Sequence, residues 1–92
     1  METMKKINLI NGQFTSFEAR ELLMDLYTKN INFNKLQNFS AQIRYGNDDD
    51  SALERIVFLK ESIEQITQIL DEAKANNKKV VINSFIDIEI EY

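Results

Sequence analysis

The sequence contains no cysteine and no histidine, and these two absences remove several functional classes at once. Without cysteine the chain can form neither a disulfide nor a thiolate metal site. Without histidine it lacks the commonest general base and the commonest side-chain metal ligand. Its serines therefore have no histidine that could activate them as nucleophiles. We expect a protein that is not an enzyme and that binds no cofactor or metal.

Proline is also absent, and only two glycines, Gly12 and Gly46, occur in 92 residues. So few helix and strand breakers allow long regular elements. No apolar run approaches the length of about 20 residues that spans a membrane. No continuous apolar segment follows Lys5 and Lys6, so the start does not resemble a secretory signal. We expect one domain, residues 1–92, in a cytoplasmic protein without a membrane partner.

The net charge of −4 is unevenly distributed, because residues 1–46 carry +2 and residues 47–92 carry −6. Two interpretations are open. Complementary fields can orient two copies or another partner, or each element simply carries its own solvated face. The sequence favours the second interpretation.

The strongest pattern is a heptad stripe on one long helix, expected from Ser51 to Asn77. Apolar side chains recur there at alternating spacings of four and three, namely Ala52, Ile56, Leu59, Ile63, Ile66, Leu70 and Ala73. Such a stripe must be buried against a neighbour. Ser51 and Glu54 form a candidate capping box at its start, and the preceding run Asp48–Asp50 favours the positive end of the helix dipole. The same run matches no calcium-binding loop, so we interpret it as helix capping and not as a metal site.

The first half of the chain predicts a short strand within residues 4–14, followed by a turn at Asn11-Gly12. Thr15 and Glu18 form a capping box that opens a helix ending at Asn30 or Asn32. Helical spacing resumes from about residue 33, which predicts a second helix to residue 45 that ends at Gly46. Whether residues 15–46 form one helix or two is left open by the sequence.

The last segment has a period of two from residue 80 to residue 92, in which one set of positions is apolar except for Ser84 and the other set is polar except for Val81 and Phe85, and this predicts a strand with one apolar face. Its other face carries Asp87, Glu89 and Glu91, which we interpret as solvated. The predicted fold is therefore α+β in the order β-α-α-α-β, with helices packed on one face of a small sheet. Because the last strand is longer than the first and two strands alone are marginal, we expect a homodimer to complete the sheet. The sequence decides neither the direction of pairing nor whether the strands pair within one chain.

These surfaces suggest a non-catalytic protein that acts through self-association or by binding another protein, as an adaptor, regulatory or structural module. The candidate interface residues are the apolar positions of the long helix and the last strand, namely Ile56, Leu59, Ile63, Ile66, Leu70, Ile86, Ile88 and Ile90. An alternative is a regulatory protein that binds nucleic acid through a basic and aromatic patch of Lys35, Arg44 and Tyr45. The acidic net charge disfavours this alternative.

Overall fold

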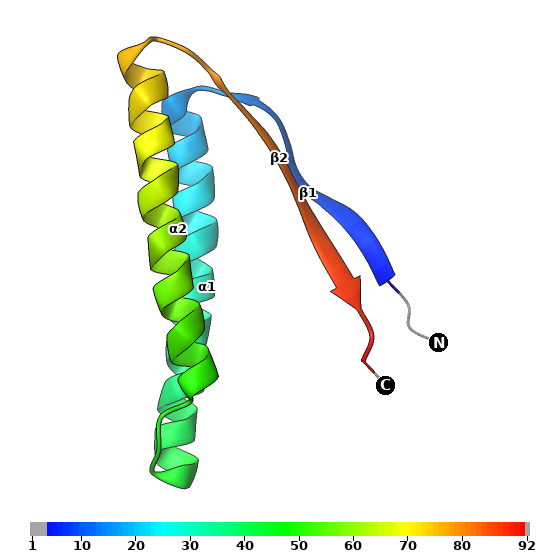
Figure 1. Ribbon diagram of the computed structural model, residues 1–92, viewed down its shortest axis with the longest axis vertical. Coiled ribbons are helices and arrows are strands. Elements are labelled where there is room, and N and C mark those ends of the chain that lie inside the picture. Colours follow the sequence, from blue (N-terminus) through cyan, green and yellow to red (C-terminus); the bar gives the residue numbers. More distant parts are fainter. Residues whose placement is uncertain (1–3, 92) are drawn as a thin grey trace.

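The computed structural model describes residues 4–91 and has four elements, β1 (Met4–Phe14), α1 (Ser16–Tyr45), α2 (Asp50–Ala75) and β2 (Val80–Glu89). The helices form an antiparallel hairpin, and the strands form an antiparallel ribbon that leaves one end of this hairpin (Figure 1). The α+β class is confirmed. The predicted β-α-α-α-β order is wrong, because one helix occupies the region for which two were predicted.

The helix α1 is continuous because nothing between its caps forces a break. At its start the Thr15 backbone N–H donates to the Glu18 carboxylate (2.9 Å), and the Glu18 N–H donates to the Thr15 hydroxyl (3.1 Å). At its end Gly46 adopts the left-handed conformation (φ 73°) that a C-cap requires, as predicted. An interior asparagine costs only about 0.5–0.7 kcal/mol of helix propensity, so the predicted ends at Asn30 and Asn32 do not form.

The helix α2 begins earlier than predicted, because Asp49 and not Ser51 is its N-cap. The Asp49 carboxylate accepts from the Ala52 N–H (3.1 Å), so the predicted capping box is wrong. Its neighbour Asp48 accepts from the side-chain amide of Gln42 on α1 (2.6 Å), which fastens the short connection between the helices. The predicted stop is confirmed, since α2 ends at Ala75 and the two asparagines 76 and 77 follow it.

The ribbon pairs β1 with β2 inside one chain along almost their full lengths, from Met4 opposite Glu89 to Phe14 opposite Val80. One irregularity between Asn8 and Ile10 adds an extra residue to β1. The turn predicted at Asn11-Gly12 is wrong, because both residues lie inside β1. The first strand is no shorter than the last, so the predicted surplus edge of the last strand is also absent.

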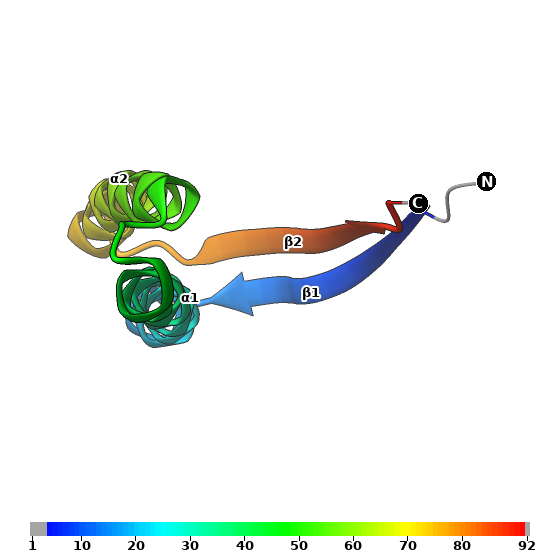
Figure 2. The same cartoon turned by 90° about the horizontal axis from the view of Figure 1, so that it is seen from below.

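The buried apolar core of the described residues is small and lies mainly between the helices, at Ala19, Ile31, Ala52, Ile56 and Leu70. Arg20 on α1 and Asp71 on α2 add an ion pair at the ribbon end of the hairpin (2.7 Å). Seen from below, the ribbon projects sideways from the stacked helices (Figure 2). The half of the ribbon nearest the helices lies against them, as far as Leu9 and Ser84, so within one chain the predicted packing of helices on one sheet face forms over only part of the ribbon.

Candidate functional site

The apolar stripe of α2 faces α1 and the root of the ribbon. Ile56 and Leu70 are buried there, and the stripe residues between them are partly buried, namely Leu59, Ile63 and Ile66. Leu70 and Ile66 also line a hollow against Val80 and Ile82 at the start of β2. These predicted interface residues therefore have little surface left to offer to a partner.

The predicted interface residues of the last strand are placed differently, because they extend beyond the helices. One face of the ribbon, which we call the apolar ribbon face, carries Ile7, Leu9, Ile10, Ile82, Ile86 and Ile88. Ile82 is partly buried near the hairpin, whereas Ile86 and Ile88 are 40% and 49% exposed. Ile90, just past the end of β2, is 45% exposed. The apolar face thus becomes more exposed with distance from the hairpin.

The opposite ribbon face is mostly polar, with Val81 (67% exposed) and Phe85 (47% exposed) as its apolar residues on β2. Lys6 lies opposite Asp87, and its ammonium group lies 5.0 Å from the centre of the Phe85 ring. Asn11 and Asn83 are paired on the same face. The Lys6 ammonium group over the Phe85 ring and the side-chain amides of Asn11 and Asn83 can all remain hydrated. Water therefore suits the polar face, whereas the apolar ribbon face is exposed without a matching cover.

A second exposed apolar strip runs along α1, on a side of the helix that does not face α2. Its positions follow spacings of four and three without interruption and consist of five apolar and two polar residues: Leu22, Leu26, Lys29, Phe33, Leu36, Ser40 and Ile43. We call this strip the α1 seam. The exposed fraction of its apolar residues rises from 39% at Leu22 to 58% at Phe33 and 69% at Ile43. A heptad strip of this kind is the pattern by which one helix packs on another.

The α1 seam and the apolar ribbon face adjoin one another. Leu26 of the seam and Leu9 of the ribbon line the same hollow together with Ser84. Leu22 of the seam lines another hollow with Phe14, at the end of β1, and the other residues of that hollow are acidic, namely Glu18, Glu21 and Asp25. The two strips therefore form one apolar surface across helix and ribbon.

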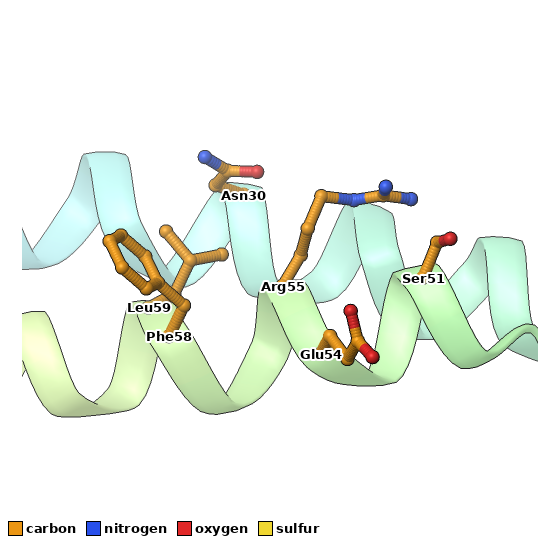
Figure 3. Close-up of a pocket in the computed structure, with 6 residues that line it drawn as sticks. All are labelled: Asn30, Ser51, Glu54, Arg55, Phe58 and Leu59. Carbon is orange, nitrogen blue, oxygen red and sulfur yellow. The ribbon is translucent and has the colours of Figure 1, made fainter.

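A groove of about 500 Å³ lies between the helices and is lined by Asn30, Ser51, Glu54, Arg55, Phe58 and Leu59 (Figure 3). Phe58 stands at one end of this groove beside Leu59, and Arg55 extends from α2 toward α1 (Figure 3). The Arg55 Nε donates to Asn34 Oδ1 at 2.6 Å, so one face of its guanidinium group is held by α1. This groove offers one hydrogen-bonded cation and an apolar wall, and no nucleophile paired with a base.

The carboxylates of the described residues are dispersed. Nowhere between residues 4 and 91 do three acidic groups converge on a point that could hold a metal ion. The pKa of the Glu18 carboxyl group is lowered by hydrogen bonds from the Thr15 backbone N–H and then from the Thr15 side chain. This shift belongs to the helix cap and indicates no acid–base function.

The residues predicted for nucleic-acid contact are exposed but are not gathered on one side. Lys35 and Arg44 are nine residues apart on the same helix, which is about two and a half turns, so they project from opposite sides of α1. Tyr45 is exposed at the end of α1. A phosphate backbone needs clustered cations, and these two do not form a cluster.

The helices of the described residues include none that is long and apolar enough to cross a membrane. Comparison with known proteins finds no matching family model, no similar curated protein and no similar solved structure. The inference of function therefore depends on the surface described above.

Proposed function

We propose that this chain is a non-catalytic association module, whose apolar surface is completed by another polypeptide and most simply by a second copy of itself. The observation that carries the proposal is the exposed area of the single chain, 7424 Å². A folded monomer of 10.8 kDa exposes about 5,500 Å², so this chain exposes about 1,900 Å² more than its mass requires.

This excess has the size of a protein interface. Standard complexes bury about 800 Å² on each partner, and permanent dimers bury more. The radius of gyration leads to the same conclusion, because it is 16.5 Å, whereas a compact chain of this length has about 12 Å. The chain is extended because the ribbon projects from the hairpin and leaves its apolar face exposed.

The chemistry of the excess surface also supports association. The α1 seam and the apolar ribbon face form a contiguous apolar region, and soluble monomers seldom leave such regions exposed. Among residues 4–91, no three acidic groups converge on one point. A binding role uses the exposed apolar residues, whereas an enzymatic role would leave them unexplained.

Sedimentation equilibrium combined with the fluorescence of a hydrophobic dye tests the proposal. We expect particles of at least two chains that unfold cooperatively and bind little dye. A single chain of 10.8 kDa that unfolds cooperatively and binds dye strongly would also support the proposal, with a different protein as the partner. A cooperatively folded single chain that binds no dye would contradict it, because its apolar surface would then be covered within one chain.

A further inference from the structure

The α1 seam has a symmetry that points to a specific partner. Its seven positions extend from Leu22 to Ile43, and Phe33 is the fourth of them. When a second copy of the helix is laid antiparallel on the first about this centre, every seam position meets another seam position. Leu22 then lies opposite Ile43 of the other copy, and Phe33 lies opposite itself. Self-complementarity of this kind is what a two-fold symmetric interface requires.

The two polar positions fit the same arrangement. Ser40 meets Leu26 of the other copy, which places a small side chain against a large one. Lys29 meets Leu36, and its ammonium group already forms an ion pair with Asp25 at 3.0 Å beside the seam. The Lys29 stem can therefore cover an apolar neighbour while its charge remains in water. A polar residue in a seam, such as Lys29, can also fix the register of the two helices.

The charges of α1 favour the antiparallel direction over the parallel one. Its first half carries Glu18, Glu21, Asp25 and Lys29, which sum to −2 when Arg20 is set aside because it is paired with Asp71 on α2. Its second half carries two cations, Lys35 and Arg44, of which only Arg44 lies beside the seam, because Lys35 projects from the opposite side of the helix. Asp48, near the end of α1, accepts from the side-chain amides of Asn38 and Gln42 and keeps its negative charge on the α2 side of the helix. Beside the seam, an antiparallel pair therefore sets the net negative first half of one copy against Arg44 of the other at both ends, whereas a parallel pair sets like charges together.

We propose that a second copy of this chain docks antiparallel along the α1 seam, with the two-fold axis at Phe33, so that two helical hairpins form a four-helix assembly. This inference rests on the proposed function and names its partner and its geometry. The seam extends over about 30 Å of helix, and the adjoining ribbon face adds to the available area. The excess of about 1,900 Å² per chain is sufficient for such a dimer.

The first test compares two aspartate substitutions at equally exposed positions. Phe33, at the proposed axis, is 58% exposed, and Val57, on α2 outside the seam, is 57% exposed. Phe33→Asp places two carboxylates face to face across the axis, so we expect dimer dissociation to become at least roughly 30-fold easier. Val57→Asp should leave the mass of the particle unchanged. Circular dichroism of both variants checks that the hairpin remains folded.

The second test uses disulfide formation and does not depend on a destabilised variant. The natural chain has no cysteine, so each variant contains only the cysteine that is introduced, and any disulfide must join two chains. Leu22→Cys mixed with Ile43→Cys should form a cross-linked dimer under mild oxidation, whereas Leu22→Cys alone should not. In the antiparallel arrangement the two copies of residue 22 are separated by about 30 Å along the helices, far beyond the span of a disulfide of about 7 Å between Cα atoms.

The outcomes separate this inference from the proposed function. The wild-type chain could be a dimer that Phe33→Asp does not weaken, or Leu22→Cys could cross-link with itself. Either result would refute antiparallel docking along the α1 seam and would leave the proposed function as an association module in place. If the wild-type chain is a monomer at every concentration, the second copy is overturned, and the dye experiment decides the proposed function by itself.

Discussion

Asn34 is the one buried polar side chain of the described residues, and it offers a quantitative test of how the hairpin is held together. It is 2% exposed. Its amide group donates to the Asn30 backbone oxygen (2.9 Å) and to the Asn30 side-chain oxygen (3.1 Å), and its own oxygen accepts from Arg55 Nε (2.6 Å). The bond to Arg55 is the part that joins α1 to α2.

The cost of Asn34→Ala follows from these contacts. A hydrogen bond to a charged group contributes about 1.5–3 kcal/mol, and the exposure of Arg55 to water places this bond toward the lower end of that range. The substitution also regains about 0.6 kcal/mol of helix propensity. We therefore expect the free energy of unfolding to fall by about 1–2 kcal/mol, which lowers Tm by roughly 5–15 °C.

A double-mutant cycle with Asn34→Ala and Arg55→Ala, followed by urea unfolding, isolates this bond. Protein concentration must be held constant, because association contributes to the measured stability. We expect a coupling energy of about 1 kcal/mol or more. A coupling below about 0.3 kcal/mol would refute the reasoning, since that is the size of ordinary additivity error. Asn32→Ala is the matched control, because Asn32 is an exposed asparagine in the same helix and its substitution should be neutral or slightly stabilising.

Four further predictions concern the caps and the core. Thr15→Ala should lower the free energy of unfolding by about 1 kcal/mol in chemical denaturation, and an unchanged value would contradict the observed cap. Because folding lowers the pKa of Glu18, the carboxylate contributes to the stability of the folded chain. This contribution is complete above the ordinary pKa of 4.5 and is lost as the pH falls through the lowered value. Melting curves of wild type and Glu18→Gln should therefore converge in acid. Gly46→Ala should cost about 1 kcal/mol, since φ is 73° there, with Gly46→Asn costing less; equal costs would argue against this conformation. Leu70→Ala should cost about 2–5 kcal/mol, whereas Ile69→Ala, at an exposed neighbour, should cost under about 1 kcal/mol; similar values would mean that Leu70 is not a core residue.

The elements that sequence reasoning predicted best were those determined by local patterns. The seam of α2 was predicted from its spacing, and the cap at Thr15 from two residues three positions apart. The strand β2 was predicted from a period of two in its side chains. Each of these signals lies within a few residues, so no knowledge of the partner element was needed.

The errors arose where a distant contact decided the outcome. Asn30 and Asn32 suggested a helix end, but the helix continues through both, and the nearby Asn34 is satisfied by Arg55, 21 residues away. Asn11-Gly12 suggested a turn, but pairing with β2 keeps both residues in the strand. Tertiary contacts overrode local preference at both places.

The α1 seam was missed for the same reason. The predicted helix end at Asn30 or Asn32 divides the seam, and only a continuous helix places Leu22 and Ile43 on one line. A search for 4-3 spacing across the whole range 16–45 would have found it, because no glycine or proline interrupts that range.

The register of the ribbon has a mechanical consequence. Met4 and Glu89 are paired, so the described ends of the two strands lie side by side at the tip farthest from the helices (Figure 1). The bonds between antiparallel strands run perpendicular to the strands, so a load that separates these two residues acts along the bonds and breaks them one pair at a time. Tension applied at the tip would therefore unzip the ribbon before it reached the hairpin.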